Sequence, residues 1–142
     1  MKKYKVGYTQ GTYDMFHIGH LNLLRNAKSL CDKLIVGVNS DKLVQQYKSK
    51  TPVICEMERA EIISELKCVD QVVICTTLNK TSIWHNFHYD AIFIGDDWKG
   101  NERWKQTELD LLPFGAAVVY LKHTDGISST LLRVHKTEKI ED

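Results

Sequence analysis

Two histidines separated by an isoleucine and a glycine stand out as residues whose spacing suits chemistry. They are His17 and His20, within residues 11–20 (GTYDMFHIGH). Imidazoles three residues apart on an opening helical turn point the same way, and Gly19 lets a ligand's oxygens approach the backbone. The free N–H groups and positive dipole end of a following helix would attract a triphosphate. A tight turn whose histidines only cap the helix is the alternative, and the motif alone leaves both interpretations open.

The segments that must position these histidines alternate between strands and helices. Short apolar or β-favouring runs predict strands at 4–8, 34–38, 72–75, 91–95 and 117–121. Apolar residues at helical spacing predict helices at 18–31, from the caps at 39–41 to 47, at 56–66, from 81 or 82 to about 88, at 101–112 and at 128–136. The alternation predicts an α/β fold with a doubly wound, Rossmann-like parallel sheet of about five strands. One domain covering residues 1–142 is expected.

Within the helix at 56–66, apolar residues recur at Met57, Ala60, Ile63 and Leu66, which predicts that they form its buried face. Arg59 is expected on another face of this helix. The polar, basic residues 48–52 that precede it are expected to form a loop ended by Pro52.

Polar clusters follow three of the predicted strands. They are residues 11–20 after the first strand, residues 96–98 (DDW) after the fourth, and residues 123–130 (HTDGISST) after the fifth. In an open parallel sheet, ligands bind beyond the carboxyl ends of the strands, where the strand order reverses. The convergence of three clusters at this edge favours the phosphate-binding interpretation of the histidine pair.

The composition argues against several classes of protein. The 142 residues are 43% hydrophobic and 26% charged, with a formal net charge of +1, so bulk charge does not favour nucleic-acid or membrane binding. The first residues do not resemble a signal peptide or a membrane span. The four cysteines show no CxxC spacing and are expected to be reduced thiols in a cytoplasmic protein. Neither they nor the pair His85 and His88 favour a metal site.

Taken together, these segments resemble the HxGH-type cytidylyltransferases among the nucleotidyltransferases. Residues 11–20 are similar to the family motif GxFDxxHxGH, residues 67–72 (KCVDQV) to RYVDEV, and residues 123–130 to RTEGISTT. Residues 95–98 (GDDW) resemble the glycerol-3-phosphate cytidylyltransferase branch in particular. The resemblance covers most of the chain. It implies that an acceptor phosphate attacks the α-phosphorus of CTP and that pyrophosphate leaves without a covalent enzyme intermediate.

The resemblance also assigns roles to residues of this chain. The expected catalytic residues are His17, His20 and Lys50. The expected acceptor-binding residues are Lys48 and Lys80. The expected nucleotide-binding residues are Thr12, Tyr13, Gly19, Asp97, Trp98, His123, Thr124, Gly126, Ile127, Ser128, Ser129 and Thr130. Asp14 is expected to organise its loop. Arg59 is expected either to add a cation to the site or to form a salt bridge on its helix.

The same resemblance implies a divalent cation, Mg²⁺ by preference, although no ligand set for it can be recognised. It implies a homodimer with residues 67–72 near the interface, and as partners CTP and a phosphorylated small molecule. Three positions depart from the family pattern: His123 and Lys67 replace arginines, and Asp125 replaces a glutamate. The segment between Trp98 and His123 is longer than in the short glycerol-3-phosphate enzymes. These departures leave the reaction in place and leave the acceptor open.

Glycerol 3-phosphate is the favoured acceptor; phosphocholine, phosphoethanolamine and other polyol phosphates are alternatives. An adenylyltransferase using ATP is a second alternative, because residues 127–131 (ISSTL) also resemble the ends of such enzymes. Residues 17–20 spell the HIGH signature of class I aminoacyl-tRNA synthetases, but those enzymes need a much longer chain. A non-catalytic nucleotide-binding protein is the remaining alternative.

Overall fold

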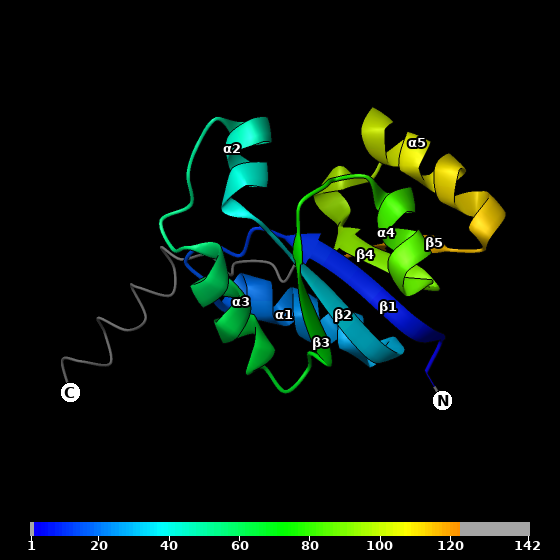
Figure 1. Cartoon of the computed structure of the whole chain (residues 1–142). Helices are drawn as coiled ribbons and strands as arrows, with labels where there is room; N and C mark the ends of the chain where they lie inside the picture. Colours follow the sequence, from blue (N-terminus) through cyan, green and yellow to red (C-terminus); the bar gives the residue numbers. More distant parts are fainter. Residues whose placement is uncertain (1, 123–142) are drawn as a thin grey trace.

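The centre of the fold is a sheet of five parallel strands (Figure 1). The computed structural model describes residues 2–122. The sheet has the order β3-β2-β1-β4-β5 and is formed by β1 (Tyr4–Gly11), β2 (Cys31–Asn39), β3 (Gln71–Cys75), β4 (Ala91–Gly95) and β5 (Ala117–Leu121). Because the order reverses direction on the two sides of β1, the predicted doubly wound sheet is confirmed.

Helices cover both faces of this sheet (Figure 1). One face packs against α1 (Ile18–Ser29) and α3 (Glu56–Ser64). The other packs against α4 (Lys80–Phe87) and α5 (Glu102–Leu111). Three shorter elements complete the described chain: α2 (Asp41–Lys48), which follows β2 directly, and the 3-10 helices η1 (Asp96–Trp98) and η2 (Leu112–Phe114). No helix among residues 2–122 is long and apolar enough to cross a membrane.

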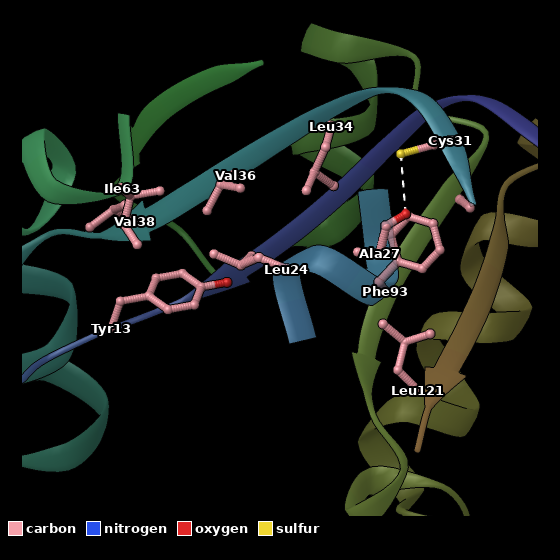
Figure 2. Packing of buried hydrophobic residues seen from close by; sticks show 11 residues of the cluster. Tyr13, Leu24, Ala27, Cys31, Leu34, Val36, Val38, Ile63, Phe93 and Leu121 are labelled. Atoms are coloured by element: carbon pink, nitrogen blue, oxygen red, sulfur yellow. Dashed lines mark hydrogen bonds between the residues drawn. The ribbon is translucent and has the colours of Figure 1, made fainter. Parts of the chain in front are cut away.

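The core has two parts, one on each side of the sheet. On β2, Val36 and Val38 face the cluster that includes Leu24 of α1 and Ile63 of α3 (Figure 2). Ile35, which directly precedes Val36 on the same strand, belongs to the opposite cluster with residues of α4 and α5. This two-sided burial explains why the sequence of β2 is continuously apolar.

Two strand boundaries differ from the prediction by three residues each, and the end of β2 and the start of β3 differ by one. β1 continues to Gly11 instead of ending at Tyr8, because its polar last residues pair with β2 as far as Val38. Cys31, expected at the end of the first helix, begins β2 and pairs with Tyr4. In both cases pairing with a central strand overrides the local sequence pattern.

Several helix boundaries also differ. Asn79, and neither Thr81 nor Ser82, caps α4, because its side-chain oxygen accepts the N–H groups of both. The predicted helices at 101–112 and 56–66 are shorter by one or two residues at their ends, and a 3-10 turn with Pro113 follows α5. Lys48, expected in the loop, is the last residue of α2.

Candidate functional site

A cavity of about 1090 Å³ opens at the carboxyl ends of the strands. Its volume is at the upper end of the range for small-molecule sites, which suits two substrates better than one. Nine of the predicted site residues line it: Thr12, Tyr13, Gly19, His20, Lys48, Lys50, Lys80, Asp97 and Trp98. The predicted residues His123, Thr124, Gly126, Ile127, Ser128, Ser129 and Thr130 lie outside the described residues.

The two histidines form a stacked pair at the start of α1. Their ring centroids are 3.9 Å apart, and the ring planes differ by 25°. His20 lines the cavity, while His17, against its ring, is the N-cap of α1. The N–H of Gly19 donates to Nδ1 of His17 at 3.0 Å, and the N–H of His17 donates to Nδ1 of His20 at 3.2 Å. These hydrogen bonds confirm that the two histidines cap the start of α1.

Capping does not exclude a role in binding phosphate. A neutral imidazole whose Nδ1 accepts a hydrogen bond carries its proton on Nε2. Both rings are thus held in the tautomer whose Nε2–H is available as a donor. Two such donors, fixed in direction by the backbone, can hold anionic oxygens without adding charge to the site.

The neutral form of His20 is also favoured by its surroundings. Burial, and in second place the neighbouring His17, lowers the pKa of His20 to about 4. A second proton would have to be placed on Nδ1, which already accepts the N–H of His17. His20 is therefore neutral at pH 7, and its Nε2–H can donate a hydrogen bond.

The loop between β1 and α1 is anchored by Asp14, as predicted. Its two carboxylate oxygens accept the N–H groups of Val53 at 2.8 Å and Ile54 at 2.9 Å. Desolvation raises the pKa of the Asp14 carboxyl, but these two N–H groups, together with the charge of Arg59 and the N–H of Met15, hold the pKa below its usual value. The carboxylate thereby ties the histidine loop to the basic segment after α2.

Tyr13 lies differently from what its predicted role suggests. Its φ is +54°, in the left-handed region that bulky residues rarely adopt. The side chain is only 6% exposed and belongs to the core (Figure 2), where its ring meets His20 edge-on at 5.6 Å. Tyr13 therefore supports the imidazole from below, and we expect any nucleotide contact to involve its backbone.

Of the two roles expected for Arg59, the structure shows the salt bridge, which Arg59 forms with Asp41 from a buried position. Arg59 is 1% exposed and donates to the carbonyls of Ile54, Thr12 and Asn39 and to Oδ1 of Asp41, at 2.6–2.8 Å. These groups come from the ends of β1 and β2, the start of α2 and the segment before α3. Arg59 thus joins the loops that form one side of the cavity.

The predicted buried face of the segment 56–66 is confirmed at Ile63, against whose cluster Ala60 and Leu66 also pack, and is wrong at Met57. Arg59 and Ile63, four residues apart, are the buried residues of α3, whereas Met57, expected in the core, is 67% exposed. Residues four apart share a helical face, so this spacing was visible in the sequence. Burial of Arg59 was not predicted from this spacing, because arginine is rarely fully buried in proteins.

The three predicted lysines occupy opposite sides of the cavity. Lys48 and Lys50 line it from the end of α2 and the following loop. Lys80 lines it from the first turn of α4, where its Nζ lies 3.4 Å from Oε1 of Gln10 and 5.8 Å from the ring centroid of Trp104. The cavity is therefore bordered by cations at both ends.

Several lining residues were missed by the sequence interpretation. Gln10 and Asn39 stand at the ends of the two central strands, and Nε2 of Gln10 donates to Oδ1 of Asn39 at 2.7 Å. Asn39 in turn donates to the hydroxyl of Tyr47 at 3.1 Å, and that hydroxyl also lies 3.1 Å from the hydroxyl of Thr12. Position directly after a buried strand was the available signal. The further lining residues Arg103, Trp104, Thr107 and Asp110 come from α5.

A metal site is not formed by protein side chains alone in the described part of the chain. Among residues 2–122, no three His, Cys, Asp or Glu side chains are grouped so that they could hold a metal ion. The carboxylates of Asp14, Asp97 and Asp110 are among the groups that line the cavity. Mg²⁺ usually takes one or two carboxylates together with substrate phosphates, and this donor set fits that mode.

Comparison with known proteins gives a consistent family match. A family model described as cytidylyltransferase-like matches residues 8–135. The glycerol-3-phosphate cytidylyltransferase of Bacillus spizizenii is 37% identical over 126 residues, covering 88% of this chain and 92% of that protein. The bifunctional protein HldE of Paramagnetospirillum magneticum is 38% identical over 131 residues, covering 91% of this chain. The chain spans only about a quarter of the length of that relative, 26%.

Solved structures give the same fold. The lipopolysaccharide core biosynthesis protein of Thermoplasma volcanium superposes with a TM-score of 0.74 at 28% identity, covering 86% of this chain and 99% of that one. A pantoate-beta-alanine ligase of Francisella tularensis superposes with a TM-score of 0.61 at 14% identity, covering 96% of this chain and 70% of that one. At that identity, the second likeness concerns the fold alone.

Proposed function

The chain belongs to the cytidylyltransferase-like family of nucleotidyltransferases, and on this premise we propose that it joins CTP to a small phosphorylated acceptor. The products are a CDP-linked compound and pyrophosphate. The observation that carries the proposal is the stacked histidine pair, whose Nε2–H donors are fixed by backbone hydrogen bonds beside a cavity lined by cations.

In the proposed reaction, an oxygen of the acceptor phosphate attacks the α-phosphorus of CTP in line with the departing pyrophosphate. The bond between the α-phosphorus and the bridging oxygen breaks, and its electron pair leaves with the pyrophosphate. His17 and His20 donate hydrogen bonds to phosphate oxygens as negative charge shifts toward the leaving group. Lys50 adds a positive charge from the loop held by Asp14, so the protein mainly positions the reactants and stabilises charge.

For the nucleotide, we propose that Thr12, Tyr13, Gly19, Asp97 and Trp98 form the described part of the pocket. For the acceptor, we propose Lys48 and Lys80. Glycerol 3-phosphate is favoured, because the chain aligns with 92% of a relative named for that substrate. CTP is favoured over ATP by the same relative and by residues 95–98.

Three further features belong to the proposal. Mg²⁺ would enter with the triphosphate, which supplies most of its ligands. The active form would be a homodimer, as the resemblance of residues 67–72 implies. The free thiols of Cys31, Cys55, Cys68 and Cys75 suit a reducing compartment such as the cytoplasm.

The test is a pyrophosphate-release assay with Mg²⁺, offering CTP or ATP against glycerol 3-phosphate, phosphocholine and phosphoethanolamine, with the product identified by mass. We expect turnover with CTP and the highest kcat/KM for glycerol 3-phosphate. His17→Ala should lower kcat about 10²–10³-fold, as expected for loss of a donor that acts in the transition state.

His85→Ala is the matched control, since His85 is exposed on α4 and contacts only the rings of Trp84 and Phe114 among the described residues. It should keep the parent rate. A preference for ATP would refute the cytidylyl assignment and leave nucleotidyl transfer in place. Binding of CTP without turnover on any phosphorylated acceptor would instead favour a non-catalytic nucleotide-binding protein.

A further inference from the structure

Helix α5 contributes a second cation beside Lys80, which the sequence interpretation did not assign. Arg103 and Lys80 both line the cavity on the side of α4 and α5. The positive charge of Arg103 repels that of the Lys80 ammonium and thereby lowers the pKa of Lys80. The indole of Trp104, adjacent to Arg103 in sequence and 7% exposed, lies under the Lys80 ammonium.

Neither cation is neutralised by a carboxylate within residues 2–122: no ion pair of Lys80 or Arg103 occurs there. The ammonium of Lys80 has an amide oxygen, Oε1 of Gln10, as its hydrogen-bond acceptor at 3.4 Å. That oxygen also accepts the hydroxyl of Tyr8 at 2.7 Å, so it is shared between two donors. Within the described part of the chain, these two neighbouring cations therefore repel each other, and an anion bound between them would relieve the repulsion.

The side chains around Lys80 come from β3, α5, η1 and the segment between α4 and β4. Cys75 on β3 is a nearby thiol, Arg103 approaches from α5, and Asp97 on η1 lines the same cavity. The hydroxyl of Tyr89 donates to the Lys80 carbonyl at 2.8 Å. Burial, with a smaller contribution from Arg103 and against the effect of Cys75, lowers the pKa of Lys80 to about 8.

We propose that Arg103 and Lys80 together bind the phosphate group of the acceptor, so that α5 takes part in acceptor recognition. A phosphomonoester dianion matches two cations in charge, and a guanidinium can donate two parallel hydrogen bonds to it. The indole of Trp104 is already occupied by the Lys80 ammonium, which leaves this ring unavailable as a cage for a quaternary ammonium. The inference rests on the proposed function for the identity of the second substrate, but the anion site can be tested by binding alone.

The experiment compares Arg103→Gln with Lys105→Gln. Lys105 is an exposed residue of the same helix, is paired with Glu102 at 3.8 Å and does not line the cavity. With glycerol 3-phosphate at saturating CTP, Arg103→Gln should raise the KM of the acceptor about 10–100-fold, as expected for loss of a hydrogen bond to a charged group. The KM of CTP should change by less than about threefold, and Lys105→Gln should match the parent protein.

A pH profile provides a readout that a merely structural role of Arg103 would not change. Between pH 7 and 9.5 the acceptor is already a dianion. We expect kcat/KM for the acceptor to fall as the pH rises through about 8, because Lys80 loses its proton. Without the charge of Arg103 this fall should move to higher pH, and in Lys80→Arg it should disappear, because a guanidinium stays protonated.

Calorimetric binding of glycerol 3-phosphate, phosphocholine and phosphoethanolamine separates this inference from the proposed reaction. Binding that Arg103→Gln weakens, in a protein without turnover, would overturn the proposed function and support the phosphate site. Turnover with equal acceptor KM values in Arg103→Gln and Lys105→Gln would overturn the inference and leave the reaction standing. Absence of both binding and turnover would overturn both.

Discussion

The burial of the Arg59 guanidinium predicts that its replacement lowers the free energy of unfolding. Its side chain has no exposed surface, while that of its ion-pair partner Asp41 is 32% exposed. Replacing Arg59 with methionine removes the charge and all five donors and keeps much of the side-chain volume. Water can reach Asp41 after the substitution, but the carbonyls of Thr12 and Asn39 would lose a buried donor.

The expected magnitude follows from these contacts. A hydrogen bond to a charged group contributes about 1.5–3 kcal/mol, and the four bonds of Arg59 share one side chain, so their contributions do not simply add. Breaking a buried ion pair typically costs about 3–5 kcal/mol. We expect Arg59→Met to lower the free energy of unfolding by about 3–5 kcal/mol, a large part of the roughly 5–15 kcal/mol available to a domain.

Urea denaturation at pH 7, followed by circular dichroism and fluorescence, measures this loss. Arg25→Met on α1 is the matched control, since Arg25 is exposed, and it should stay within about 0.5 kcal/mol of the parent. Arg59→Lys should fall between them, because an ammonium retains the charge without the planar fork. A loss below about 1 kcal/mol for Arg59→Met would contradict this prediction. It would show that the desolvation free energy of the buried guanidinium nearly cancels the stabilisation from its contacts.

Three further predictions concern residues that line the cavity. His20 has a pKa of about 4 in the folded state, below the value of about 6.5 in the unfolded chain. Its contribution to stability, about 1 kcal/mol after allowing for partial exposure, should therefore be complete above pH 6.5 and be lost as the pH falls toward 4. The urea midpoints of the parent protein and His20→Gln should then converge at low pH. Asp14→Ala should cost about 1–3 kcal/mol and accelerate hydrogen exchange at the amides of Val53 and Ile54, whereas unchanged exchange would refute the anchoring role. Asn79→Ala should lower stability by about 1 kcal/mol through loss of the α4 cap, and an unchanged urea midpoint would contradict that cap.

Most of the fold could be predicted because hydrophobic periodicity reports burial directly. The segments 91–95 and 117–121 were predicted at their observed bounds, since each is a continuous apolar run in a sheet covered on both faces. The end of β1 could not be predicted in this way. Thr9 and Gln10 are polar, and their strand conformation depends on pairing with β2, a tertiary contact that local sequence does not encode.

The site shows the same division. The spacing of His17 and His20 predicted a pair, but the sequence posed capping and phosphate binding as alternatives, and the structure shows that one nitrogen of each ring can cap while the other stays free. The salt bridge expected as one role of Arg59 is present, but the burial of Arg59 and its bonds to three carbonyls from other segments were not predicted. Every residue has a backbone carbonyl, so the residue types do not indicate which carbonyls accept a hydrogen bond. Contacts of this kind can be recognised only in the structure.

The central place of β1 in the sheet has a consequence for synthesis of the chain. β1 pairs on one side with β2 and on the other with β4, where Gly7 lies opposite Ala91, 84 residues later in the sequence. At about 5–20 residues per second, the ribosome needs about 4–17 s to add that stretch. During this interval one edge of the first strand has no partner, and unpaired edges are templates for aggregation. Of the five strands of this sheet, the one that carries the histidine loop is thus made first and is among the last to have both edges paired.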